Sequence, residues 1–197
     1  MTCMKCCNIF STWFSISCGI RQGGVLSPYL FAIYIDSLVH KVQSCGYGSY
    51  VRHTCVSILL YADDILLLAS SVSSLQLLLD VCERELDRLD ITVNVKKSSC
   101  IRIGQRFDAH CCITTRIGGE VLWGNTLRYL GVHISAGSKF CCSLSNAKRS
   151  FYRAFNFIFS KVGRIAYENV VIELLKAKCL PSLYYGLDAL PNKQITN

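Results

Sequence analysis

The sequence predicts a fold of the α+β class, in which helices pack against small antiparallel sheets. Apolar residues recur at helical spacing in several segments, and short apolar runs come in pairs on either side of turn residues. The chain has 197 residues, of which 51% are hydrophobic, so it can bury a substantial core. Because only 17% of the residues are charged and only 3 are prolines, the composition excludes a disordered or collagen-like protein.

Two helices are predicted in the first half of the chain. The first follows Ser27-Pro28, because a serine caps a free backbone N–H and a proline fits the first helical position. Its apolar residues recur every three or four positions until Gly46. The second helix carries a leucine-rich stripe, and either Ser73 or Ser74 is expected to cap it.

Two strands are predicted between these helices, from Val56 to Leu60 and from Ile65 to Ala69. A tight turn at Tyr61-Ala62-Asp63-Asp64 joins them. Further short strands are expected after the second helix. They run from Ile91 to Val95, from Cys100 to Ile103, from Ile113 to Ile117, from Val121 to Trp123, and as a pair around Gly131.

The last part of the chain is predicted to be helical. One amphipathic helix follows Ser145-Asn146, and another runs from Glu168 to Cys179, where Pro181 is expected to stop it. We expect a domain boundary near Gly137, with residues 1–136 on one side and residues 137–197 on the other.

Positive charge is concentrated in the second half of the chain. Residues 1–90 contain 6 basic and 8 acidic side chains, whereas residues 91–197 contain 15 basic and 5 acidic ones. This asymmetry favours contact with a polyanion, and with nucleic acid rather than a membrane. A solvated basic face is the alternative interpretation.

The cysteines and the apolar runs point to an intracellular protein of the nucleus or cytoplasm. The 13 cysteines are odd in number, so we expect reduced thiols and no disulfide-linked partner. A zinc site that includes Cys3 and Cys6 is the less favoured alternative. The longest apolar run, from Ser57 to Ala69, is too short to span a bilayer and contains two aspartates, so we expect neither a membrane segment nor a targeting segment.

The two adjacent carboxylates in the predicted turn are the most informative feature of the sequence. Two like charges about 4 Å apart repel by about 4 kcal/mol at an effective dielectric constant of about 20, and a bound divalent cation reverses the sign of this energy. The oxygen donors of Asp63 and Asp64 have no His or Cys nearby, which favours Mg²⁺ over zinc. An ordinary exposed turn is the alternative.

Four motifs follow one another along the first two thirds of the chain. They are GIRQGGVLSPYLF at residues 19–31, YADD at 61–64, N-x-x-KS at 94–98 and LRYLG at 127–131. In this order they resemble the palm of reverse transcriptases, most closely those of non-LTR retrotransposons. The resemblance implies a partial palm over residues 1–136, with an antiparallel sheet and packed helices, and the start of a helical thumb over residues 137–197. A group II intron enzyme is the nearest alternative, but its pattern fits less well.

The resemblance also implies roles for individual residues. Asp63 corresponds to the family's metal-binding aspartate, which holds two Mg²⁺ ions in the complete enzyme, and Asp64 to an auxiliary acid. Tyr61 is expected beside the primer end, and Lys97 near the leaving pyrophosphate. A plain strand tyrosine and a solvated turn are the respective alternatives. The implied partners are an RNA template, a DNA primer or RNA–DNA hybrid, and a dNTP.

Three further sets of residues are implied to contact nucleic acid. The first contacts template and incoming nucleotide, where glycines let the backbone approach closely. The second forms the primer grip, and the third holds the phosphate backbone. In this order the sets are Gln22, Gly23 and Gly24; Tyr129, Leu130 and Gly131; and Lys148, Arg149 and Arg153.

The sequence departs from the family pattern at its start. The family needs a further aspartate from an earlier palm strand, yet no Asp or Glu lies between Met1 and Arg21. The fingers are also missing, so we expect little or no polymerase activity from this palm-and-thumb fragment alone. Its parent reaction is Mg²⁺-dependent nucleotidyl transfer to a primer 3′-hydroxyl. A remnant that binds nucleic acid without catalysis and a decayed element without function are the alternatives.

Overall fold

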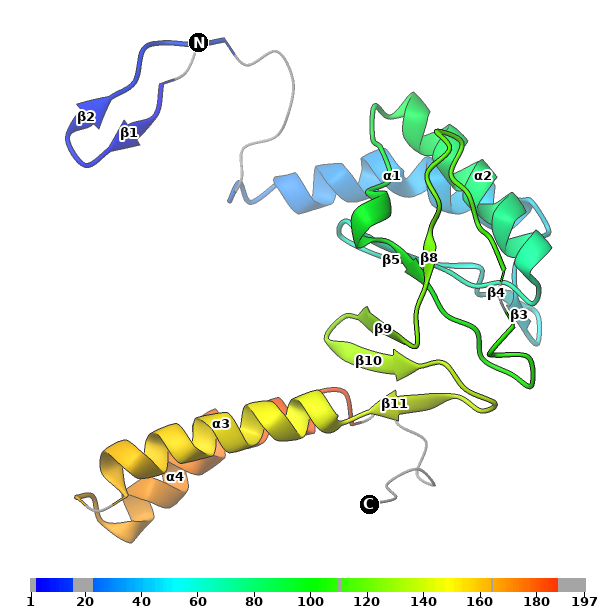
Figure 1. Ribbon diagram of the computed structural model, residues 1–197. Helices are drawn as coiled ribbons and strands as arrows, with labels where there is room; N and C mark the ends of the chain where they lie inside the picture. Colours follow the sequence, from blue (N-terminus) through cyan, green and yellow to red (C-terminus); the bar gives the residue numbers. More distant parts are fainter. Residues whose placement is uncertain (1–2, 16–22, 110, 164, 188–197) are drawn as a thin grey trace.

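The computed structural model describes residues 3–15, 23–109, 111–163 and 165–187 (Figure 1). These residues form a short N-terminal hairpin, a central body of helices and small sheets, and a C-terminal group of helices. The sheets contain two or three strands each. Among the described strands, β1 to β11, every pair is antiparallel except one. A mixed fold of helices and small antiparallel sheets is therefore confirmed.

The core of the central body lies between two helices and one β-hairpin. Helices α1 (Ser27–Ser44) and α2 (Val72–Arg88) pack against each other and against the hairpin of β5 (Ile58–Tyr61) and β6 (Asp64–Leu67). Burying each large apolar side chain stabilises the fold by about 1.5–3 kcal/mol. The buried cluster consists of Ile35, Leu38, Val42, Ile58, Leu78, Cys82 and Leu86.

The register of the β5–β6 hairpin gives it an inner and an outer face. Ile58 pairs with Leu67 and Leu60 with Ile65; Ile58 belongs to the buried cluster, and the other three side chains pack against it. The alternating pairs are Leu59 with Leu66 and Tyr61 with Asp64. Because successive side chains point to opposite faces of a strand, these four residues occupy the face turned away from the helices.

The helix starts differ in detail from those predicted. Helix α1 begins at Ser27 itself, and Leu26 occupies the position before it. At α2, Ser71 is the cap, so the prediction of Ser73 or Ser74 was wrong. The backbone of Ser71 is extended, and its Oγ accepts the N–H of Ser74 at 3.0 Å, whereas Ser73 and Ser74 already lie inside the helix.

The region after α2 contains less regular structure than predicted. A short 3-10 helix, Val95–Lys97, ends the segment expected to be a strand from Ile91 to Val95. Strand β7 (Ser99–Cys100) pairs in parallel with β8 (Leu122–Trp123). The hairpin expected around Gly118-Gly119 remains as a tight turn closed by one antiparallel bridge and flanking backbone hydrogen bonds.

A three-stranded antiparallel sheet connects the central body to the C-terminal helices. Its order is β11 (Cys141–Ser143), β10 (Val132–Ser135), β9 (Thr126–Tyr129), and the pair predicted around Gly131 is β9 and β10. Two short hairpins not predicted from the sequence lie earlier in the chain. They are β1 (Lys5–Cys6) with β2 (Ile9–Phe10), and β3 (Tyr50–Val51) with β4 (Thr54–Cys55).

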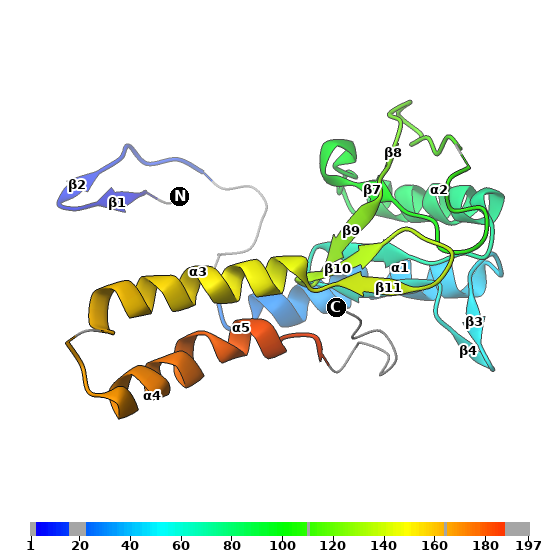
Figure 2. The ribbon, with the colours of Figure 1, turned by 60° about the horizontal axis from the view of Figure 1, so that its bottom comes forward.

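The C-terminal helices form their own packed group. Helix α3 (Ser145–Val162) runs beside α4 (Glu168–Lys178) and α5 (Leu180–Tyr184), as Figure 2 shows. The helix predicted from Glu168 to Cys179 is α4, which ends at Lys178, but a further short helix that was not predicted, α5, follows it and contains Pro181. Pro181 lies in the first turn of α5, where its missing N–H costs no hydrogen bond. Each helix in the described ranges is too short or too polar to serve as a membrane span.

Candidate functional site

The two aspartates lie at the exposed end of the β5–β6 hairpin. Tyr61 and Asp64 form the last strand pair, and Ala62 and Asp63 make the two-residue turn between them. Ala62 adopts a left-handed conformation with φ of 51°, which costs a non-glycine residue about 1–2 kcal/mol. The packed inner face of the hairpin holds this turn in place, so both carboxylates project from a well-supported strand end.

The electrostatics of this turn suit a hard cation. Neither the Asp63 nor the Asp64 carboxylate forms an ion pair or side-chain hydrogen bond with any residue that the structure describes, so no protein cation there offsets their mutual repulsion. Mg²⁺ is commonly held by one or two carboxylates together with water and substrate phosphates. Within the described ranges no group of three metal-ligating side chains forms. The pair therefore fits one such ion, and a second ion needs further ligands.

Tyr129 brings the LRYLG motif against strand β5 of this hairpin. Its Oη donates a hydrogen bond to the backbone oxygen of Leu59 at 3.3 Å, across 70 positions of sequence. Burial raises the pKa of the Tyr129 phenol, and the negative charge of Asp64 raises it further. The structure thus brings two of the four sequence motifs together.

The turn between β9 and β10 comes directly after Tyr129 in the chain. Leu130 and Gly131 both have positive φ, 47° and 80°, as in the two-residue turns that match the twist of an antiparallel hairpin. Tyr185, just after α5, donates its Oη to the backbone oxygen of Leu130 at 2.8 Å. Sequence reasoning missed both Tyr185 and Leu59, because a backbone oxygen as acceptor leaves no residue pattern to find.

The glycine-rich motif and the predicted lysine are not joined to the aspartates by any described contact. Gln22 lies outside the described residues. Gly23 precedes α1 with φ of 79°, and a Cβ added there meets no atom of the described residues within 4 Å. Gly24 is half-buried, and Lys97 is exposed at the end of the 3-10 helix without an ion pair among the described residues. Open space beside Gly23 is compatible with close approach of a ligand.

The predicted backbone-binding residues lie on the first half of α3. Lys148, Arg149 and Arg153 are all exposed, and none forms an ion pair within the part of the chain that the structure describes. Lys176 on α4, by contrast, bonds Glu173 at 2.9 Å. The three α3 cations are therefore available to phosphate groups.

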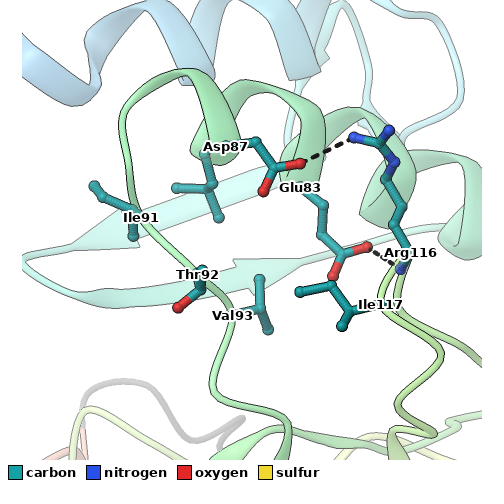
Figure 3. Close-up of a pocket in the computed structure, with 8 residues that line it drawn as sticks. Glu83, Asp87, Ile91, Thr92, Val93, Arg116 and Ile117 are labelled. Carbon is teal, nitrogen blue, oxygen red and sulfur yellow. Dashed lines mark hydrogen bonds and ion pairs between the residues drawn. The ribbon is translucent and has the colours of Figure 1, made fainter.

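A small hollow elsewhere in the body does not include any of the predicted site residues. Figure 3 shows it beside the end of α2, lined by acidic, basic and apolar side chains. Its charges are already satisfied within the chain. The backbone N–H of Arg116 donates to Glu83 at 2.8 Å, and the Arg116 guanidinium bonds Asp87 at 3.1 Å. We interpret this hollow as part of the packing of the 113–121 segment onto α2.

Comparison with known proteins gives relatives for most of the chain. A family model described as reverse transcriptase (RNA-dependent DNA polymerase) matches residues 1–134. A Pol polyprotein from the type-1 retrotransposable element R2 of Popillia japonica is 28% identical over 180 residues, which cover 87% of this chain and 28% of that protein. An RNA-directed DNA polymerase from the mobile element jockey of Drosophila funebris is 25% identical over 182 residues, covering 87% and 19%, respectively.

A third relative, the Pol polyprotein from the type-2 element R2DM of Drosophila melanogaster, is 32% identical over 102 residues, covering 52% of this chain and 8% of its own length. The chain thus spans less than a third of each of these relatives. Members of the matched family act with a nucleic-acid template and primer and use divalent metal ions. The order of the four motifs and the match over two thirds of the sequence agree, and this chain belongs to the reverse transcriptase family, with its relatives among non-LTR retrotransposons.

Proposed function

We propose that the Asp63–Asp64 hairpin is the metal-binding part of a site for RNA-directed DNA synthesis, in which a dNTP is added to a primer 3′-hydroxyl. One observation carries this proposal. The two carboxylates are exposed and without a protein cation among the described residues, at the end of a hairpin whose inner face is packed against α1 and α2. A structural turn has no need of two unpaired acids, whereas a cation site does.

The other predicted residues take their proposed roles around this pair. Asp63 and Asp64 hold Mg²⁺, which when bound neutralises charge on the triphosphate and on the attacking oxygen. Tyr61 shares the outer hairpin face with Asp64 and contacts the primer end. Lys97 offers its ammonium group to the leaving pyrophosphate. Two ions act in the complete polymerase, and the second draws on ligands beyond this pair.

The nucleic-acid contacts complete the proposal. Gln22, Gly23 and Gly24 lie along the template and nucleotide, and the turn formed by Tyr129, Leu130 and Gly131 holds the primer. Residues 1–136 correspond to a palm and residues 137–197 to the start of a thumb. The partners are an RNA template, a DNA primer or their hybrid, and a dNTP, so the place of action is the nucleus or the cytoplasm.

Metal binding tests the central step. Titration of the chain with Mn²⁺, with the free ion followed by electron paramagnetic resonance, is expected to show a site that Asp63→Asn weakens by at least about tenfold. Asp108→Asn is the matched control, because Asp108 is exposed and bonds no other described residue. Equal affinities for the native chain and Asp63→Asn refute the metal site.

Non-catalytic binding of nucleic acid is the second candidate function, and it is favoured by the three α3 cations that form no ion pair within the described ranges. Fluorescence anisotropy with an RNA–DNA hybrid at several salt concentrations separates the two functions. Replacing Lys148, Arg149 and Arg153 with Gln is expected to reduce the salt slope by about 0.7–0.9 for each phosphate that the chain no longer neutralises. If Asp63→Asn leaves hybrid binding intact and primer extension on an RNA template is absent from the native chain, the non-catalytic function is favoured.

A further inference from the structure

Two tyrosine hydroxyls tie the turn between β9 and β10 and its flanking strand to distant parts of the chain. Tyr129, the last residue of β9, donates to the backbone oxygen of Leu59 on β5 at 3.3 Å. Tyr185, just after α5, donates to the backbone oxygen of Leu130 at 2.8 Å. These bonds span 70 and 55 positions of sequence, so they join three separate parts of the chain at one two-residue turn.

The contact between α5 and this turn is close as well as hydrogen-bonded. A Cβ placed on Gly131 lies 2.9 Å from Cε1 of Tyr185, so the ring rests directly against the glycine. A Cβ placed on Gly186 lies 2.9 Å from Cγ2 of Val132, the first residue of β10. The turn thus places a glycine against a side chain of the 185–186 segment, and that segment places a glycine against a side chain of β10. The missing Cβ atoms let the two backbones approach closely.

The contact made by Tyr129 reaches the hairpin that carries the aspartates. Leu59 and Asp64 occupy the same outer face, because Leu59 pairs with Leu66 and Tyr61 pairs with Asp64 in alternating register. The Tyr129 hydroxyl donates to the backbone oxygen of Leu59, which lies two residues before Tyr61 on β5. A displacement of β9 thus acts on the strand that leads into the acidic turn.

We propose that Tyr129 and Tyr185 are positioning residues that couple the C-terminal helices to the Asp63–Asp64 turn through the Leu130–Gly131 turn. Helix α5 packs against α3, which carries the exposed cations. Binding of a nucleic-acid phosphate backbone to α3 is therefore transmitted through α5 and this turn to the carboxylates. The consequence for catalysis rests on the proposed function, whereas the mechanical coupling is a property of the chain itself.

Hydrogen–deuterium exchange on the full chain tests the coupling. Tyr185→Phe removes one hydroxyl and keeps the ring. We expect amide exchange to rise by about two- to tenfold, the effect of removing one hydrogen bond, both at residues 130–132 and at residues 60–64. Tyr184→Phe is the matched control, because Tyr184 is an exposed neighbour whose hydroxyl bonds no other described residue. In this control both segments keep their native exchange.

A second pair of variants distinguishes coupling from general loosening. In a Tyr129→Phe background, Tyr185→Phe is expected to change residues 130–132 but no longer residues 60–64. If Tyr185→Phe alone unfolds the chain, Gly186→Ala perturbs the same junction through Val132 and must give the same pattern. Unchanged exchange at residues 60–64, or a response that persists without the Tyr129 hydroxyl, overturns the proposal. Failure of Mn²⁺ binding instead removes the proposed function and leaves this exchange pattern as it is.

Discussion

Replacing Gly131 with alanine gives a sharp test of the junction between the strands and the C-terminal helices. The backbone of Gly131 has φ of 80°, and an L residue in that region costs about 1–2 kcal/mol. The new methyl group also lies 2.9 Å from Cε1 of Tyr185, so the ring must move and break its hydrogen bond to Leu130, which is worth about 0.5–1.5 kcal/mol. The free energy of unfolding is therefore expected to fall by about 1.5–3.5 kcal/mol.

The backbone cost and the cost of the contact with Tyr185 are separated by one control variant and by one second substitution at Tyr185. Gly118 has a similar φ of 85°, but no atom in the part of the chain that the structure describes lies within 4 Å of an added Cβ, so Gly118→Ala is expected to cost only the backbone energy of about 1–2 kcal/mol. In a Tyr185→Ala background, Gly131→Ala is expected to cost no more than that control. Urea unfolding measures each free energy. Equal costs at Gly118 and Gly131 in the native background refute the close contact with Tyr185.

Two further predictions concern the core of the central body. Leu38 on α1 is fully buried against α2 and β5, so Leu38→Ala is expected to lower the free energy of unfolding by about 3–5 kcal/mol. Ile33 on the same helix is exposed, and Ile33→Ala is expected to lower it by less than about 0.5 kcal/mol. A decrease below about 1 kcal/mol for Leu38→Ala contradicts this packing. Burial raises the pKa of the Cys82 thiol from 9.0 to about 12, so between these pH values the thiol ionises only in the unfolded chain. The free energy of unfolding is therefore expected to fall by about 1.4 kcal/mol per pH unit as pH rises through that range. Cys82→Ala removes this part of the slope, and parallel curves for the two proteins above about pH 9 are inconsistent with a buried neutral thiol.

Local patterns in the sequence predicted the elements that position the candidate site. Helical periodicity after Pro28 and the paired apolar runs around Asp63 each depend on neighbours within a few positions, and both elements form. The strands are displaced from their predicted bounds, because Tyr61 and Asp64 pair with each other and leave a turn of two residues where four were predicted. The cap of α2 was misassigned by two or three positions, because Ser71, Ser73 and Ser74 offer the same hydroxyl and only the backbone conformation selects among them.

Contacts between distant segments were beyond such reasoning. The parallel pair of β7 with β8 joins two separate segments through backbone groups, which carry no residue signature. The same holds for the bonds of Tyr129 to Leu59 and of Tyr185 to Leu130. Metal binding by Asp63 was predicted from its adjacent carboxylate as well as from the family resemblance, whereas the role of Lys97 came from the resemblance alone. Both stay predictions until metal binding and catalysis are measured.

The two-faced hairpin also limits how this protein can change over time. Inserting or deleting one residue within Ile58–Tyr61 shifts the alternation by one and turns the side chain of Tyr61 inward onto α1 and α2 while exposing Leu60. Strand length is therefore locked, and variation is confined to exchange of one side chain for another. A retroelement that accumulates frame-preserving indels elsewhere should keep this stretch free of them as long as its acidic tip is under selection.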